Sequence, residues 1–207
     1  GIMDKVLKSF IVFEGLDGAG TTTQIMNLAR YYEFNRREYF LTREPTDNPI
    51  GQLVRQVLQK KVATTPEALA LLYAADRHDH LFSESHGIAR MAEEGRIVIS
   101  DRYFYSSIAY QSVECDPGFI RLINAFPSPE FIIFVDTPVE ECLARIEKRG
   151  EARELFDRGE FLTSVRENYI RAFSSLPEGV KLLTVDGAQP IDTVESEIRR
   201  WLSSFSL

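Results

Sequence analysis

Five short apolar runs alternate along this chain with segments of helical period, and no other feature constrains the fold as strongly. The first run, Phe10 to Phe13, continues directly into a glycine-rich turn, and the others lie at residues 39–42, 97–99, 131–135 and 182–185. Continuously apolar strands that are separated by helices are typical of a parallel sheet covered on both faces. The order therefore predicts an α/β fold with about five parallel strands and helices on both sides.

Local residue types also predict where several helices begin and end. Asn48-Pro49 and Thr65-Pro66 each place an N-cap residue before a first-turn proline, and Gly95 suits a helix end. Thr137-Pro138-Val139-Glu140 has the order of a capping box, which predicts a helix start there. Further helices are expected where apolar residues recur at helical spacing, at 25–32, 161–173 and 191–198.

The composition narrows the choice of partners and location. A net charge of −7 argues against nucleic acid as the main partner, because proteins that bind it usually present a broad basic face. Cys115 and Cys142 form no metal-ligand spacing and no disulfide framework, so we interpret them as thiols in a reducing compartment. No apolar run approaches the roughly 20 residues that cross a bilayer, which argues against a membrane and favours the cytoplasm. Without a repeat or linker, we expect a single domain over residues 1–207.

The segment from Gly15 to Thr22, between the first strand and the first helix, suits a phosphate loop. Its glycines let successive N–H groups point inward, and the helix N-terminus adds positive potential. Thr22 stands where a hydroxyl usually helps to hold Mg²⁺, but the standard pattern G-x-x-x-x-G-K-[ST] has a lysine where this chain has Thr21. The motif by itself leaves two interpretations open, a nucleotide-binding P-loop and an ordinary strand-to-helix turn.

Charged residues follow two further apolar runs, at the expected carboxyl edge of the sheet. Asp101 and Arg102 come where doubly wound folds place their ligands, and the carboxylate of Asp101 suits Mg²⁺. Arg43 can grip a phosphate in bidentate fashion, as an acceptor site would require. Each also has a structural interpretation, Asp101 as a turn cap and Arg43 as a surface ion pair with Glu44.

Tyr73 and Arg77 are four residues apart, so both project from one face of an expected helix. A ring that stacks on a base and a guanidinium that bonds its carbonyl would form a pyrimidine pocket. In isolation, a core tyrosine and a solvated arginine are the commoner arrangement. His78 and His80 face different directions on this helix, which favours a solvated helix end over a metal site.

The densest cationic stretch of the chain lies at about 145–160. It contains Arg145, Lys148, Arg149, Arg153 and Arg158. Such a run is usually a solvated helix face. Because glycines bracket part of it, the stretch also suits a lid whose arginines close over phosphates.

Together these segments resemble the thymidylate kinase family of P-loop nucleoside monophosphate kinases, over essentially the whole chain. The motifs that carry the resemblance are Phe13-Glu14-Gly15-Leu16-Asp17-Gly18-Ala19-Gly20 with Thr22-Thr23-Gln24, Thr42-Arg43-Glu44-Pro45, Leu71-Leu72-Tyr73-Ala74-Ala75-Asp76-Arg77, Asp101-Arg102-Tyr103 with Ser106 and Ala109-Tyr110-Gln111, and the segment from Arg158 to Arg166. The segment that begins at Asp101 is the most specific of them.

The resemblance implies a P-loop NTPase fold that transfers a phosphoryl group from ATP to dTMP, giving dTDP and ADP in dTTP synthesis, with Mg²⁺ and as a homodimer. It implies an ATP site formed by Gly15, Asp17, Gly18, Ala19, Gly20, Thr21, Thr22, Thr23 and Arg145. It implies a dTMP site formed by Asp17, Arg43, Tyr73, Arg77, Arg102, Ser107, Tyr110 and Gln111. Within that site Asp17 would contact the sugar 3′-hydroxyl, Arg43 and Arg102 would hold the phosphate, and Tyr110 would crowd a 2′-hydroxyl.

The resemblance also implies the catalytic and metal-binding groups. Gly18 stands where one branch of the family has an arginine in the loop. This chain resembles the branch that supplies its catalytic arginine from the lid, with Arg153 the first candidate and Arg149 the next. The implied catalytic set is Asp17, Arg102, Arg153 and Arg149, and the implied metal ligands are Thr22 and Asp101.

Two alternatives stay open at the level of sequence. A nucleotide-binding protein that has lost catalysis would explain Thr21, and a P-loop kinase for another deoxynucleotide would share most of the motifs. A GTPase is excluded, because the chain contains no Asn-Lys-x-Asp motif.

Overall fold

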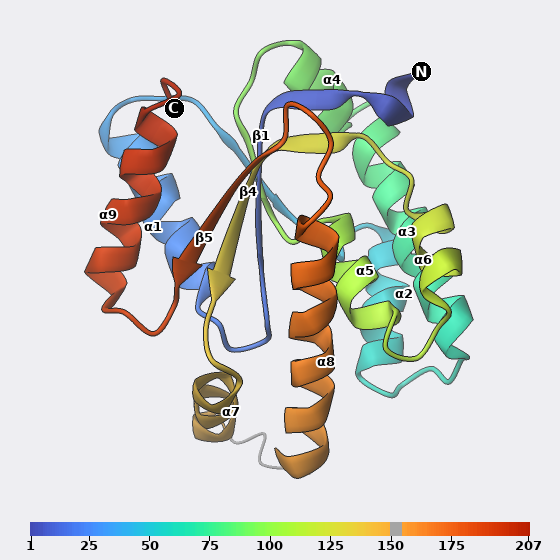
Figure 1. Ribbon diagram of the computed structural model, residues 1–207. Helices are drawn as coiled ribbons and strands as arrows, with labels where there is room; N and C mark the ends of the chain where they lie inside the picture. The colour runs from blue at the N-terminus through green and yellow to red at the C-terminus, as the bar shows by residue number, and fades with distance from the viewer. Residues whose placement is uncertain (150–154) are drawn as a thin grey trace.

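The computed structural model describes residues 1–149 and 155–207, except for the side chains of 155–157. In this part of the chain, five parallel strands form one sheet in the order β2-β3-β1-β4-β5 (Figure 1). The strands are β1 (Val6–Gly15), β2 (Phe40–Arg43), β3 (Val98–Asp101), β4 (Ser128–Asp136) and β5 (Lys181–Asp186). Each predicted apolar run forms one of these strands, so the predicted α/β fold is confirmed.

Helices connect the strands, and a short 3₁₀ turn, η1 (Ile2–Asp4), precedes the first. The helices are α1 (Thr21–Phe34), α2 (Pro49–Leu58), α3 (Pro66–Phe82), α4 (Ile88–Glu93), α5 (Phe104–Gln111), α6 (Pro117–Ile123), α7 (Val139–Lys148), α8 (Leu155–Phe173) and α9 (Ile191–Ser203).

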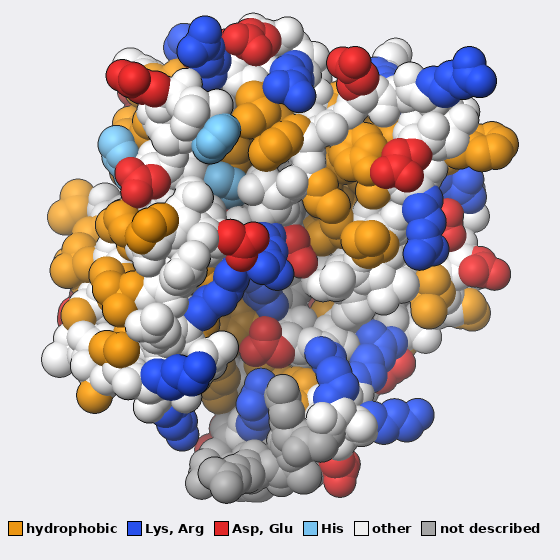
Figure 2. Space-filling model, turned by 180° about the vertical axis from the view of Figure 1, so that it is seen from behind, with side chains coloured by type: hydrophobic (Ala, Val, Ile, Leu, Met, Phe, Trp, Pro, Cys, Tyr) orange, Lys and Arg blue, Asp and Glu red, His pale blue; other side chains and the backbone are white. Residues whose placement is uncertain are grey.

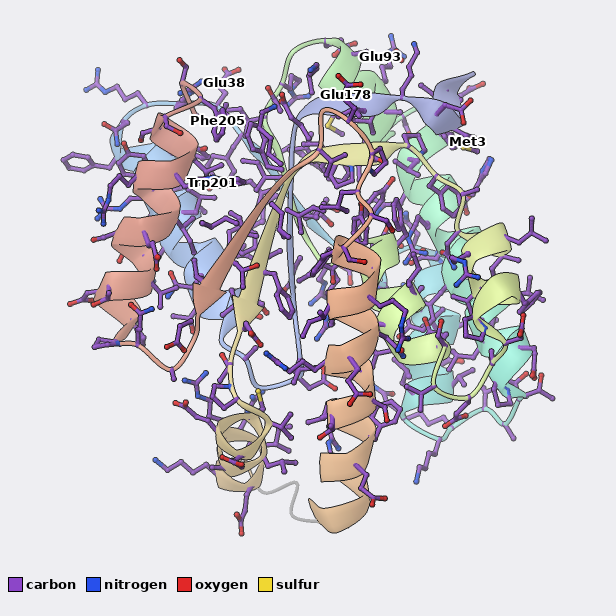
Figure 3. All side chains as sticks on the ribbon, in the orientation of Figure 1. Met3, Glu38, Glu93, Glu178, Trp201 and Phe205 are labelled. Atoms are coloured by element: carbon purple, nitrogen blue, oxygen red, sulfur yellow. The ribbon has the colours of Figure 1, made fainter. Side chains whose placement is uncertain are left out.

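Two aromatic contacts on β4 show that helices cover both faces of the sheet. Phe131 packs against Trp201 of α9, with ring centroids 5.6 Å apart, and Phe134 packs against Tyr169 of α8 at 5.2 Å. Because positions 131 and 134 point to opposite sides of a strand, α9 and α8 lie on opposite faces (Figure 1). Trp201 and Phe205 lie together toward the end of the chain, beside the sheet (Figure 3).

The helix signals in the sequence are borne out with one exception. Thr65 caps α3 by accepting a hydrogen bond from the Ala68 amide at 3.1 Å, and Gly95 follows α4 with a φ of +80°. The predicted capping box at Thr137 is wrong. Pro138 occupies the N-cap position of α7, and the Thr137 hydroxyl instead donates to the Ala19 carbonyl at 2.8 Å. This hydroxyl ties the end of β4 to the loop after β1.

Among the described residues, no helix is both long enough and apolar enough to cross a membrane. The cytoplasmic location stays a prediction.

Candidate active site

The ends of three neighbouring strands bring the predicted residues to one edge of the sheet. Phe13 of β1 and Arg43 of β2 both lie opposite Asp101 of β3 in the strand pairing. The phosphate loop, the turn after β2 and Arg102 therefore all follow the carboxyl ends of neighbouring strands, at the same edge of the sheet. Figure 2 shows a hollow in the middle of the molecule, bordered by Lys, Arg and acidic side chains.

The loop between β1 and α1 has the backbone of a phosphate loop. Gly18 and Gly20 have φ angles of +83° and +95°, in the left-handed region that favours glycine. Gly18 also lies close to α7, because a Cβ atom at this position would be 2.7 Å from the carbonyl oxygen of Cys142. An arginine at position 18 therefore has no room while α7 keeps its place.

Thr21 stands in place of the loop lysine, and its side chain is buried. Its Cγ2 is 3.1 Å from where a Cβ on Gly15 would lie, so the methyl group points back toward β1. Arg145 of α7 lies against the same loop, donating to the Gly18 carbonyl at 3.1 Å and to the Gly187 carbonyl at 3.2 Å. The Arg145 guanidinium thus brings to the loop a positive charge that Thr21 lacks.

A cleft of about 780 Å³ opens on this loop. It is lined by all the predicted loop residues from Asp17 to Thr23, and by the cationic side chains Arg102, Arg145, Arg149 and Arg158. A polyphosphate in this cleft would meet both backbone amides at the start of α1 and guanidinium groups.

Thr22 and Asp101 lie together at the base of this cleft. The Thr22 hydroxyl donates to Asp101 Oδ2 at 3.3 Å. Burial raises the pKa of Asp101, and Arg102 and the Thr22 hydrogen bond oppose this shift. A hydroxyl and a partly buried carboxylate are the hard oxygen ligands that Mg²⁺ prefers, so these two residues fit the ion.

A second cleft, of about 930 Å³, adjoins the first and contains most of the predicted acceptor residues. It is lined by Asp17, Tyr73, Arg77, Arg102, Ser107, Tyr110 and Gln111, among others. Asp17, Arg102 and Arg158 line both clefts, so these three side chains mark the junction between them.

Arg77 is 1% exposed, which rules out the solvated arginine considered from the sequence. Its Nε donates to Glu44 at 2.8 Å, Nη2 donates to Ser107 at 3.2 Å, and Nη1 donates to Asn124. A guanidinium has five N–H donors, and three bonds leave two for a ligand. Arg77 is therefore fixed in direction and can still bond a base.

His80 is also buried, so the predicted solvated helix end is wrong for this residue. Its Nδ1 lies 2.9 Å from Glu44 and its Nε2 lies 2.6 Å from the Thr42 hydroxyl. Glu44 thus lies between His80 and Arg77. Burial alone would raise the pKa of Glu44, but the charge of Arg77 and the hydrogen bond with His80 lower it. No group of His, Cys, Asp and Glu among the described residues has the arrangement of a metal site.

Arg102 is held from two sides at the junction of the clefts. Its Nη2 donates to Asp17 at 3.0 Å, and its Nη1 donates to Ser106 at 3.1 Å and to Tyr169 at 3.3 Å. Its guanidinium carbon lies 5.2 Å from the ring centroid of Tyr110. Arg102 also has a φ of +73°, an unusual value for a residue other than glycine.

Arg43 is the predicted acceptor residue that the structure does not bring into the second cleft. It is exposed, and its Nη2 donates to Asp47 at 2.7 Å instead of to Glu44. Asp47 also pairs with Arg55 at 2.7 Å. The sequence motif gave no indication of this pairing, since Asp47 lies outside the segment that carries the resemblance.

The chain also resembles known proteins in sequence. The family model described as thymidylate kinase matches residues 13–198. The chain belongs to the thymidylate kinase family. A relative from Treponema pallidum, provisionally named a thymidylate kinase, is 39% identical over 204 residues, which cover 97% of each chain. Two proteins named as probable thymidylate kinases, from Pyrococcus horikoshii and Thermococcus kodakarensis, are 39% and 37% identical and cover 91% of this chain and 93% and 94% of their own length.

For this thymidylate kinase family member, sequence reasoning gave no role to three residues that support the site, namely Glu14, Asn124 and Tyr169. Glu14 accepts hydrogen bonds from Ser106 and Tyr169, and Asn124 orients Arg77. A carboxylate inside the apolar run that precedes the phosphate loop was the available signal for Glu14. Asn124 and Tyr169 had no signal, because they reach the site from distant parts of the chain. Arg153, the first candidate for the lid arginine, lies outside the described residues.

Proposed function

We propose that this protein transfers the γ-phosphoryl group of ATP to dTMP, giving ADP and dTDP. The observation that carries the proposal is the junction of the two clefts. A donor nucleotide on the loop and an acceptor nucleotide in the second cleft would meet at Asp17, Arg102 and Arg158, which line both clefts in the described part of the chain. A phosphate oxygen of dTMP then attacks the γ-phosphorus, and the bond to the β–γ bridging oxygen breaks, releasing ADP.

The second cleft supports a pyrimidine deoxynucleotide as acceptor. Tyr73 offers a ring for stacking, and Arg77 is held with free donors for a base carbonyl. The side-chain oxygen of Gln111 is buried without a hydrogen-bond partner among the described residues, and a base N–H would supply one. The Tyr110 hydroxyl accepts a hydrogen bond from the Asp17 amide at 2.9 Å, which fixes the ring where it would crowd a 2′-hydroxyl.

The first cleft supports ATP as donor, with Mg²⁺. Loop amides and the start of α1 would hold the phosphates. Thr22 and Asp101 would hold Mg²⁺, which neutralises phosphate charge when it is bound. Arg145 is fixed by Glu141 at 2.8 Å and by two backbone carbonyls, so its charge stays beside the loop.

Catalysis requires cations around the transferred group, and Thr21 cannot supply one. Phosphoryl transfer depends mostly on positioning and on electrostatic stabilisation, so the place of a cation matters more than the residue that carries it. Arg102, Arg145, Arg149 and Arg158 all line the first cleft. We propose that arginines from α7, the lid and α8 together replace the missing lysine, which makes the protein an active kinase and not a binding module.

We also propose a homodimer, as the family resemblance implies. The neighbouring helices α2 and α3 expose Leu53, Leu58 and Leu71, which are 36%, 51% and 49% exposed. Large apolar side chains that gather on a surface suit contact with a second copy. Sedimentation of the purified protein measures the oligomeric state, and a monomer at micromolar concentration contradicts this proposal.

A coupled ADP-release assay with ATP and Mg²⁺ tests the activity. We expect dTMP to be the preferred acceptor, dUMP to be weaker by a factor that corresponds to roughly 1–3 kcal/mol, and UMP to be poor. Equal turnover of UMP and dTMP would overturn the assignment of the acceptor. Binding of both ATP and dTMP, seen by calorimetry, without any dTDP would establish the binding module instead.

Two variants assign the sides of the site. Arg102→Ala and Arg43→Ala should each weaken dTMP binding far more than ATP binding, because each removes a cation proposed to contact the acceptor phosphate. A variant that loses ATP affinity and keeps dTMP affinity would reverse the assignment.

A further inference from the structure

Glu14 is a fully buried carboxylate in β1, one residue before the phosphate loop. The proposed reaction gives it no contact with either nucleotide. It is absent from the residues that line the two clefts, in the part of the chain that the structure describes. Burying a carboxylate is unfavourable unless it is paired or hydrogen-bonded, so a fully buried glutamate beside the site is expected to have a structural or functional role.

The contacts of Glu14 all lead toward Arg102. Its Oε1 accepts from the Ser106 hydroxyl at 2.5 Å and from the Tyr169 hydroxyl at 2.9 Å. The same two hydroxyl oxygens accept from Nη1 of Arg102, at 3.1 and 3.3 Å. Two hydroxyl groups, one on α5 and one on α8, therefore connect the carboxylate with the guanidinium.

Glu14 also fixes the backbone beside Arg102. Its Oε2 accepts from the Tyr103 amide at 2.9 Å, which holds the peptide that follows Arg102. On the other side of this peptide unit, the Ser100 hydroxyl donates to the Arg102 carbonyl at 2.7 Å, and the Arg102 amide donates to the Phe13 carbonyl at 2.9 Å. A left-handed φ in a residue with a large side chain persists only where its surroundings hold it, and such residues cluster at functional sites.

We propose that Glu14 is a positioning residue for the reaction, and that it holds Arg102 in place for the acceptor phosphate through Ser106, Tyr169 and the Tyr103 amide. This inference rests on the proposed role of Arg102 toward dTMP. Asp17 holds the other guanidinium nitrogen at 3.0 Å, so Arg102 keeps one direction before the acceptor binds. Preorganised cations of this kind require no rearrangement during the reaction.

The test compares Glu14→Gln with the parent enzyme and with Glu130→Gln. Glu130 is a matched control, because it is a carboxylate in β4 that accepts from a backbone amide, Ser9 at 2.9 Å, and lies at the opposite edge of the sheet. KM for dTMP and KM for ATP are measured separately, and dTMP affinity is measured without ATP. We expect Glu14→Gln to raise KM for dTMP about tenfold and to leave KM for ATP within about twofold, whereas Glu130→Gln changes neither.

Two further variants follow the proposed path without altering Glu14. Ser106→Ala and Tyr169→Phe each remove one hydroxyl and leave the Tyr103 amide bonded to Glu14, so each should raise KM for dTMP by less than Glu14→Gln, and the double variant should raise it more than either single variant. Adding Glu14→Gln to that double variant then removes only the bond to the Tyr103 amide, so it should raise KM by a smaller factor than Glu14→Gln does in the parent. These variants also keep the proposal testable if Glu14→Gln does not fold.

The outcomes separate this inference from the proposed function. A parent enzyme that does not phosphorylate dTMP refutes the function itself. An active parent whose Glu14→Gln variant has unchanged dTMP affinity, or loses affinity for ATP and dTMP equally, overturns the role of Glu14 alone.

Discussion

The Arg43 guanidinium donates to the carboxylate of Asp47 at 2.7 Å, outside the cleft that the acceptor is proposed to enter. The hydrogen bonds from Arg43 and Arg55 lower the pKa of Asp47, so this carboxylate is ionised near neutral pH. If Arg43 holds the acceptor phosphate as proposed, the phosphate takes the guanidinium from Asp47. Both side chains are exposed, and water weakens their attraction, so the exchange is easy.

We expect Asp47→Asn to lower KM for dTMP by roughly two- to fivefold, because Arg43 loses its competing partner. Steady-state kinetics at fixed ATP measures this change. Glu94→Gln is the control, since Glu94 also forms an exposed pair with an arginine, Arg90, at 3.2 Å. A rise in KM would mean that Asp47 places Arg43 for binding and does not compete for it.

Arg145→Met should raise KM for ATP about tenfold or more and leave KM for dTMP nearly unchanged. The substitution removes a charged donor that lies against the phosphate loop. Adding Thr21→Lys to this variant should restore part of the loss, because the ammonium group then supplies the missing charge. If the double variant is no better than Arg145→Met, Arg145 does not act in place of the lysine.

Arg77→Met should destabilise the protein by about 3–5 kcal/mol, because it leaves the charge of Glu44 buried without the Arg77 guanidinium. Glu44 and Arg77 are 6% and 1% exposed, so solvent does not compensate. Denaturant unfolding measures the change. Glu44→Gln in the same chain should recover part of the stability, and a double variant less stable than Arg77→Met would contradict this account.

Glu14 makes the fold less stable as the pH rises. Burial raises its pKa from the ordinary 4.5 to about 7, with the hydrogen bonds from Ser106 and Tyr169 and the charge of Arg102 acting against this rise. Between these two values the folded state binds more protons than the unfolded state, so the free energy of unfolding falls with rising pH across that window. The difference between the folded and unfolded pKa of Glu14 corresponds to a loss of roughly 3 kcal/mol in the free energy of unfolding above pH 7.

The measurement is the free energy of unfolding of the parent and of Glu14→Gln at several pH values from 4.5 to 8. We expect the free energy of unfolding of Glu14→Gln to exceed that of the parent by an amount that grows as the pH rises. The dTMP affinity of the variant should nevertheless be lower than that of the parent. The other charged or titratable groups that act on Glu14 or feel its charge are Arg102 from the turn after β3, Tyr105 from α5 and Tyr169 from α8. These groups are present in both proteins, so the difference between the two free energies of unfolding, followed against pH, reports the titration of Glu14. If the free energies of unfolding of the two proteins change with pH in parallel, the pKa of Glu14 is not raised.

The strands could be predicted because each is a continuous apolar run, and burial on both faces requires that pattern. The phosphate loop and the residues at the ends of β1 and β3 could be placed because parallel strands end at one edge. The short helices α5 and α6 were not predicted, since eight and seven residues carry too few turns for a clear period.

Other features depend on contacts that no local pattern contains. Helical spacing put Tyr73 and Arg77 on one face, but it could not show that Glu44, Ser107 and Asn124 would surround Arg77 and bury it. His80 was misread for the same reason, because Thr42 and Glu44 reach it from β2 and the turn after it. The capping box does not form, and the Thr137 hydroxyl instead donates a hydrogen bond to the carbonyl of Ala19, a residue distant in the sequence.

The close approach of Gly18 to the Cys142 carbonyl limits which residues can replace this glycine. Any side chain at position 18 meets the backbone of α7, in addition to the strain of a φ of +83°. A single substitution at position 18 therefore cannot place an arginine in the loop. A loop arginine would require α7 to lie farther from the loop, so in this chain the position of a helix, and not the codon at position 18 alone, decides whether the loop can carry one.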